Sequence, residues 1–208
     1  MKRIMALIIA WLVLCGVSLS VLAEDAVSSA TIAVSTLPEL RENENASVLV
    51  VFFSTNDTVK AAALIAAEAL AADVFEIVPE QPYTAADLAY YTGGRCDKEQ
   101  ADDSARPGIV NWPESLDPYD VVLIGYPIWH GQAPKILYTF LERIDLSGKT
   151  VVPFCTSMSS GAGSSASNLA KLTGETTDLR PVTRISKGAS AEDIIAWALS
   201  LNLTESEN

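Results

Sequence analysis

The sequence predicts an α/β fold, a three-layer sandwich in which a five-stranded parallel sheet of strand order 2-1-3-4-5 lies between two layers of helices. Apolar runs of strand length alternate with segments of helical pattern across residues 47–201. The runs are continuously apolar, which is typical of parallel strands buried on both faces. Parallel strands need crossover helices, and right-handed crossovers produce a doubly wound sheet. We expect one domain here, with a flexible spacer at 24–46 and a polar tail at 202–208.

The first half of the domain is expected to hold two strands and one long helix. A buried strand covers 47–53, and a helix rich in Ala and Leu follows at 58–72, capped by Thr58 or Asp57. The second strand is expected at 74–78.

A long connection leads from the second strand to the third. Residues 84–91 have the pattern of a short helix, and 93–118 is polar with Gly, Pro and Asp. The latter segment is too long for a plain connection, and loops of this length have a function or hold extra short elements.

The second half repeats the alternation. The elements we expect are a strand at 120–126, a helix at 134–144 with Pro134 in its first turn, a strand at 150–156, a loop at 157–167, a helix at 166–172, a fifth strand at 183–186, and a last helix capped by Ser190 and ending near Leu201.

Residues 1–23 have the pattern of an export signal. A basic start (Lys2, Arg3) precedes an uncharged apolar stretch that ends in small residues before Glu24. We expect a signal peptide, and the alternative is an uncleaved anchor, because Ile4–Ala23 is long enough to cross a bilayer. The protein is then exported, to the extracellular space or the cell envelope.

The composition is that of an acidic globular chain. Hydrophobic residues make up 49% and charged residues 19%, so a sizeable core is expected. The formal net charge is −12, and loss of Lys2 and Arg3 would leave 12 basic against 26 acidic side chains, or −14. Such a charge repels phosphate backbones, so we expect no nucleic-acid binding. It can steer basic partners, although solubility alone explains it equally well.

The chain has a single His, so a His-rich metal site is excluded and no metal is expected. Beyond the export signal only Cys96 and Cys155 remain. Export would permit a disulfide between them, whereas the apolar run around Cys155 is typical of a buried free thiol.

Three loops should meet at one edge of this sheet. The order 2-1-3-4-5 places the carboxyl ends of strands one, three and four side by side at the topological switch point, where open α/β sheets bind ligands. The first loop, 54–58, offers hydroxyl groups and helix N-terminal N–H groups to an anion. An ordinary helix cap accounts for it equally well, and Asp57 would repel a phosphate. The chain has neither a Gly-x-Gly-x-x-Gly nor a Gly-Lys-Ser motif.

The second and third loops are suited to a flat ring. Trp129 and Tyr126 could stack on one, and Gly131 would let the backbone approach it. In the alternative, Trp129 is a core residue and His130 an exposed loop residue. The third loop, 156–165, offers hydroxyl and N–H donors with little bulk, and its alternative is a flexible linker. The three loops together predict a planar aromatic ligand and redox chemistry.

Four short motifs follow one another in this part of the chain. They are Gly-Tyr-Pro-Ile-Trp-x-Gly-x-x-Pro at 125–134, Tyr-Thr-Phe-Leu at 138–141, Asp-x-Ser-Gly-Lys-Thr at 145–150, and Pro-Phe-Cys-Thr with a Ser/Gly loop at 153–163. In this order they resemble the flavodoxin family, and within it the small flavodoxin-like proteins of bacteria. The resemblance covers about residues 47–201.

This resemblance implies a flavodoxin-like fold, a monomer, and FMN bound without a covalent link. Carried over by position, the phosphate ligands are Ser54, Thr55, Asn56 and Thr58. One side of the isoalloxazine would be lined by Pro127, Ile128, Trp129, His130 and Gly131. The other side would be lined by Thr156, Ser157, Ser159, Gly161 and Gly163.

The first loop departs from the family pattern. The family's Ser-x-Thr-Gly-Asn-Thr is replaced by Ser54-Thr55-Asn56-Asp57-Thr58, one residue shorter and without Gly. Losing two charge-assisted hydrogen bonds of roughly 1.5–3 kcal/mol each would weaken FMN binding about a hundredfold or more. His130 stands where the family often has another aromatic residue. Its imidazolium would favour the anionic reduced flavin, so we expect a potential that depends on pH between about 6 and 7.

Electron transfer by FMN is the function we expect, and it requires no catalytic acid, base or nucleophile. An FMN-dependent NAD(P)H or quinone reductase is the first alternative, and a binding module that has lost FMN is the second. A hydrolase built on Ser54, Ser157 or Ser159 with His130 would lack the Gly-x-Ser-x-Gly elbow. The sequence does not identify the redox partner.

Overall fold

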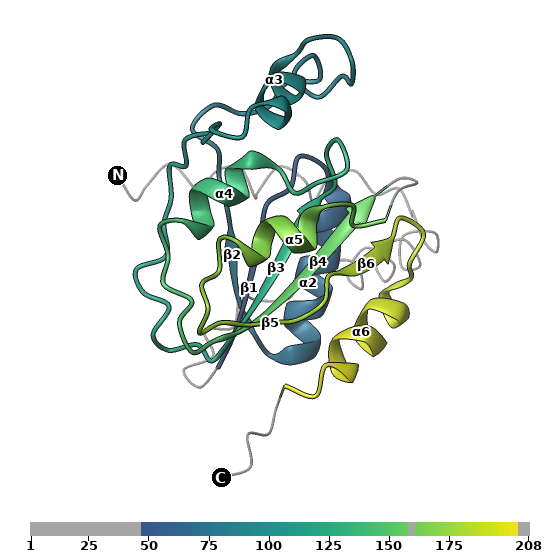
Figure 1. Ribbon diagram of the computed structural model, residues 1–208. Coiled ribbons are helices and arrows are strands. Elements are labelled where there is room, and N and C mark those ends of the chain that lie inside the picture. The colour runs from purple at the N-terminus through teal and green to yellow at the C-terminus, as the bar shows by residue number, and fades with distance from the viewer. Residues whose placement is uncertain (1–46, 158–160, 204–208) are drawn as a thin grey trace, which may run out of the picture. The chain divides into compact units, whose positions relative to one another are not determined.

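The computed structural model describes residues 47–157 and 161–203, and they form the expected α/β fold (Figure 1). All strands are parallel, in the order β2-β1-β3-β4-β5, and β6 also pairs with β4. The strands are β1 (Val48–Phe52), β2 (Asp73–Glu76), β3 (Val121–Pro127), β4 (Thr150–Ser157), β5 (Asp178–Leu179) and β6 (Thr183–Ser186). The helices are α2 (Asp57–Leu70), α3 (Arg95–Ala101), α4 (Lys135–Leu141), α5 (Ser165–Ala170) and α6 (Ala191–Ser200).

Two hydrophobic cores lie on the two faces of the sheet. Alternate residues of a strand point to opposite faces, so Leu49 and Val51 of β1 enter one core while Val50 and Phe52 enter the other. The first core is covered by α4 and α5, and the second by α2 and α6 (Figure 1). The continuously apolar strands of the sequence are therefore explained by burial on both faces.

The boundaries of α2, α4 and α5 differ by one to three residues from the sequence-based expectation. The first helix begins at Asp57, and its cap is Asn56 rather than Thr58 or Asp57, because the Asn56 side chain accepts the N–H of Thr58. The helix expected at 134–144 is shorter, with Pro134 as its N-cap and Leu141 as its last residue.

The prediction of a short helix at 84–91 is wrong. These residues form turns, and the carboxylate of Asp87 accepts both the N–H and the hydroxyl of Thr84. The Thr84 hydroxyl in turn accepts the N–H of Asp87 (3.2 Å), so the two residues form a capping box. Turns rather than a continued helix follow it, beginning with the Leu88 N–H on the Thr84 carbonyl (3.1 Å).

The fifth position of the sheet is shared by two strands instead of one. β5 and β6 both pair with β4, and residues 180–182 separate them. Pro181 has no N–H to donate to a ladder, which explains why this edge is interrupted.

The long connection of residues 77–118 does hold an extra element, α3. Asn111 attaches the connection to the end of β2, since its Oδ1 accepts the N–H of Val78 (2.9 Å) and its Nδ2 donates to the Glu76 carbonyl (2.7 Å). α3 precedes Asn111 in the connection and lies beside the turn after β3. Its Gln100 side chain donates to the carbonyls of Trp129 and Ala133 in that turn.

Cys96 and Cys155 are both buried and free, so the structure favours the thiol alternative. Burial raises the pKa of Cys96 to about 12 and that of Cys155 to about 11, so neither is a thiolate at neutral pH.

Among the residues with described positions, no helix has the length and apolar character to cross a membrane. Within the same residues, no group of three potential ligands among His, Cys, Asp and Glu is arranged to hold a metal.

Candidate functional site

The three candidate loops lie at the carboxyl edge of the sheet, as expected. β1 pairs with β3 up to Phe52–Gly125, and β3 pairs with β4 up to Pro127–Thr156. The chain order reverses between β1 and β3, so the loops flank the topological switch point.

The first loop is held by bonds within itself. The Ser54 hydroxyl donates to the Asn56 carbonyl, and Asn56 Oδ1 accepts the N–H of Thr58 at 3.0 Å. These groups include donors that the resemblance assigns to a phosphate. An anion at this helix N-terminus therefore has to displace the Asn56 side chain from Thr58 or use other N–H groups of the loop.

The second loop is a tight turn from Trp129 to Gln132. These two residues exchange backbone hydrogen bonds of 2.9 and 3.0 Å. The residues between them, His130 and Gly131, have φ values of 47° and 75°. Two central residues at positive φ characterise the primed turns, and such a conformation is uncommon for a residue other than Gly.

Trp129 is a core residue. It is 5% exposed, and its ring meets Phe53 and Tyr83 edge-on at 5.5 and 5.0 Å between ring centroids. Tyr126 is fully buried, and burial raises the pKa of its hydroxyl. Neither ring presents a face to a ligand in this structure, which favours the structural alternative for Trp129.

Other aromatic rings surround the turn at the surface. The rings of Tyr90 and Tyr91 lie 4.6 and 5.4 Å from that of His130. The Tyr90 hydroxyl contacts the Ile128 carbonyl at 3.3 Å, whereas Tyr91 is 89% exposed and has φ 60°. The sequence analysis missed both tyrosines, and the available signal was an adjacent aromatic pair just before Gly93-Gly94.

Asp97 of α3 holds this group of residues together. Its carboxylate accepts the N–H groups of Tyr91 (3.1 Å) and Gly93 (2.8 Å) and lies 2.8 Å from His130 Nε2. Burial raises the pKa of Asp97, but the backbone N–H groups and His130 outweigh this effect, and the net pKa is below its usual value. An ionised carboxylate therefore faces the imidazole.

The third loop is joined to the second. The N–H of Ser164 donates to the Gly131 carbonyl at 2.9 Å, and a Cβ on Gly163 would lie 1.8 Å from the same oxygen. Gly163 also has φ 57°, so only Gly suits this contact. The two loops that the resemblance assigns to the ring thus form one unit.

The remaining predicted residues are placed as follows. Thr156 and Ser157 are buried at the end of β4, where the Ser157 hydroxyl accepts from Arg184 Nε at 2.8 Å. Pro127 and Ile128 are buried at the end of β3, and Gly161 is exposed. Ser159 lies outside the described residues.

The part of the chain that holds these loops matches a known protein family. The flavodoxin model matches residues 47–200. The chain belongs to the flavodoxin family.

Solved structures agree with this assignment. A candidate flavoprotein from Bacteroides eggerthii DSM 20697 is 39% identical, with a TM-score of 0.69 over 76% of this chain and 98% of that one. A second, from Bacteroides uniformis ATCC 8492, is 36% identical, with a TM-score of 0.69 over 74% of this chain and 97% of that one. The search of curated proteins gave no match.

Proposed function

We propose that residues 47–201 bind FMN without a covalent link and transfer electrons through it. The observation that carries the proposal is the joined pair of loops, 129–132 and 161–164, beside the N-terminus of α2 at the switch point. The two similar structures, both candidate flavoproteins, support it over nearly their whole length. FMN supplies the redox chemistry when it is bound, and this chain supplies binding, orientation and electrostatics.

The phosphate would be held by the first loop. The N–H groups at the start of the 14-residue helix α2 form an anion site, aided by the helix dipole. Ser54, Thr55 and Thr58 would contribute once the Asn56 side chain releases the Thr58 N–H, and Asn56 would contribute through its backbone N–H.

The ring would be held by the second and third loops, beside their contact at Gly131 and Ser164. Gly131, Gly161 and Gly163 carry no side chain that would block a flat ligand. Because Trp129 is buried, the aromatic groups that a ring can reach beside this turn are His130, Tyr90 and Tyr91.

A second candidate function is a binding module that has lost FMN. The first loop favours it, because the Ser54 hydroxyl and the Thr58 N–H, donors that a phosphate would use, already donate to the carbonyl and the side chain of Asn56. An FMN-dependent NAD(P)H or quinone reductase would use the same site as the electron carrier.

The test is a titration of the apoprotein with FMN, followed by flavin fluorescence. We expect sub-micromolar binding with quenched fluorescence, weakened by Tyr91→Ala and unchanged by Leu199→Ala, which removes an exposed side chain of α6. No binding at tens of micromolar FMN would favour the binding module. Rapid oxidation of NADH or NADPH with a quinone as acceptor would favour the reductase.

We also propose that the protein is exported and acts as a monomer. The support for export is the sequence of residues 1–23, which lie outside the described part of the chain. Mass spectrometry of the protein from its host tests it, since cleavage would place the mature N-terminus near Glu24. Analytical ultracentrifugation tests the monomer.

A further inference from the structure

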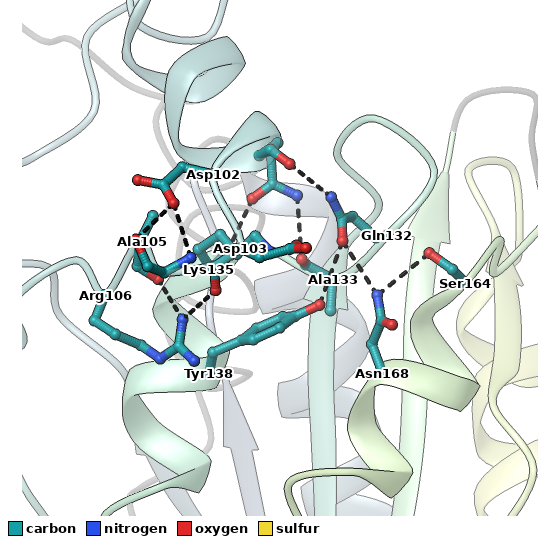
Figure 2. Close-up of polar contacts among 12 residues, drawn as sticks. Asp102, Asp103, Ala105, Arg106, Gln132, Ala133, Lys135, Tyr138, Ser164 and Asn168 are labelled. Carbon is teal, nitrogen blue, oxygen red and sulfur yellow. Dashed lines mark hydrogen bonds and ion pairs between the residues drawn. The ribbon is translucent and has the colours of Figure 1, made fainter.

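The side chain of Gln100 forms hydrogen bonds with the backbone on both sides of the turn that the proposed function assigns to the flavin. Its Nε2 donates to the carbonyls of Trp129 and Ala133, both at 3.2 Å, and its Oε1 accepts the N–H of Lys135 at 3.0 Å. Gln100 is 5% exposed. The contacts around Ala133 and Lys135 are drawn in Figure 2. One amide from α3 therefore binds backbone groups on both sides of the turn.

These backbone groups need a partner from elsewhere. The first N–H groups of a helix have no acceptor within the helix, and Pro134, the N-cap of α4, provides no side-chain cap. Gln100 Oε1 supplies that acceptor from another segment of the chain. A buried N–H or carbonyl that loses its partner costs free energy, so removal of the amide should loosen this turn.

A second chain of contacts ties the same turn to three helices. Gln132 Nε2 donates to the Gln100 carbonyl at 2.9 Å. Gln132 Oε1 accepts from the Tyr138 hydroxyl of α4 at 3.3 Å and from Asn168 Nδ2 of α5 at 3.1 Å, and Asn168 also reaches Ser164 (Figure 2). The turn is thus fixed from α3 on one side and from the third loop on the other.

Lys135 of α4 contacts Asp103, two residues after the end of α3, beside this network. Its side chain is 1% exposed, yet its Nζ lies 3.1 Å from Asp103 Oδ1 and 4.4 Å from the centre of the Tyr138 ring. The ammonium group faces a carboxylate and an aromatic face, so its burial is compensated. The segment directly after α3 is therefore attached to α4 by a contact other than the Gln100 amide, which allows the amide to be tested alone.

We propose that Gln100 is a positioning residue that sets the conformation of the turn 129–133 and, through the turn, the affinity for the flavin and the potential of the bound flavin. The part that concerns the flavin rests on the proposed function. Gln100 acts through the backbone of Trp129, Ala133 and Lys135 and makes no contact with the reacting atoms.

Two variants and one matched control test this role. Gln100→Met keeps the length of the side chain and removes all three hydrogen bonds. Gln100→Glu keeps the acceptor for Lys135 but places an oxygen against two carbonyls. Asn111→Leu is the control. Asn111 lies in the same long connection as Gln100, and its amide also bridges two backbone groups, but these belong to Glu76 and Val78, away from the turn.

The readouts are the hydrogen exchange of the Lys135 amide in the apoprotein, the dissociation constant for FMN, and the midpoint potential of the bound flavin. For Gln100→Met we expect about tenfold faster exchange and about tenfold weaker FMN binding, with a shifted potential. For Gln100→Glu we expect a larger loss of FMN affinity but a smaller rise in Lys135 exchange, because the acceptor for that N–H is kept. Asn111→Leu should lower stability and leave the dissociation constant and the midpoint potential at their wild-type values, and it should speed Lys135 exchange no more than the exchange of the core strand amides.

Unchanged Lys135 exchange in Gln100→Met overturns the proposal. Equal shifts of the potential in Gln100→Met and Asn111→Leu also overturn it, because they would show a general loss of stability. If the wild-type chain binds no FMN, the proposed function and the flavin part fail together, and Lys135 exchange still decides whether Gln100 holds the turn.

Discussion

The loop after β1 and the turn after β3 lie at the same edge of the sheet, but they are held in opposite ways. The hydrogen bonds of Ser54 and Asn56 join residues two positions apart and are exposed. The turn at Trp129 is held by Gln100, 29 residues earlier, and by Ser164, 33 residues after Gly131. One edge of the sheet can therefore combine a loop held by its own residues with a turn held by residues from distant parts of the chain.

This difference has a consequence for binding. A ligand can replace the exposed bonds of the first loop at little cost, because water satisfies the released groups. The turn is held by hydrogen bonds within the protein, so a ring bound there would lose little to the ordering of the protein. We expect substitutions at the turn to affect stability and binding together, and substitutions in the loop to affect them separately.

The largest effect is expected for Trp129→Ala. Removing a buried aromatic ring from a core costs about 3–5 kcal/mol in the free energy of unfolding. Urea denaturation of the apoprotein measures this loss. A stable variant that only binds FMN more weakly would instead support the stacking role predicted from the sequence.

Gly163→Ala should rank second. A Cβ 1.8 Å from the Gly131 carbonyl forces the two loops apart. Together with the positive φ this should cost about 2–4 kcal/mol. Gly148→Ala is the matched control, because Gly148 has φ 73° and open space around it, and should cost only about 1–2 kcal/mol. Equal losses in the two variants would show that the contact between the loops does not matter.

Asn56→Ala tests the first loop. Loss of the cap should cost about 1 kcal/mol of stability, whereas the freed N–H of Thr58 remains available to a phosphate. We therefore expect the ratio of FMN to riboflavin affinity to stay the same or rise. Ser190→Ala removes the cap of α6 and should cost a similar amount with no change in that ratio. A collapse of the ratio in Asn56→Ala would instead make Asn56 a direct phosphate ligand.

The smallest effect is expected for Asp97→Asn, and it depends on pH. The pKa of Asp97 is lowered in the folded state, so its contribution to stability is present above the ordinary value of 3.8 and is lost as the pH falls through the lowered value. Denaturation midpoints at about pH 6 and about pH 3 should therefore differ less in the variant than in the wild type.

Asp87→Asn is the control for this prediction. The pKa of Asp87 is also lowered, chiefly by hydrogen bonds from Thr84, and it holds a turn away from His130. Both variants should flatten the acid side of the stability curve, but only Asp97→Asn should change flavin binding. If both change it equally, the contact of Asp97 with His130 has no separate role.

Several features could be predicted because they depend on residues close together in the sequence. The apolar runs 47–53 and 120–126 predict buried strands, and the alternation with helices predicts the parallel order of the sheet. Ser190 predicts the cap of α6, which the structure confirms with its capping box to Asp193. The error at 84–91 shows the limit, because Thr84 and Asp87 form a capping box typical of a helix start, yet turns follow it instead of a helix.

The sequence by itself determined the fold, the family and the three loops of the candidate site, because strand burial, helix caps and loop motifs are encoded over a few consecutive residues. Only the tertiary structure decided that Trp129 belongs to the core, that Tyr90 and Tyr91 surround His130, and that Gln100 supports the turn. These features depend on how residues 77–118 fold back over the sheet. That path is set by contacts between distant segments, which no local pattern records.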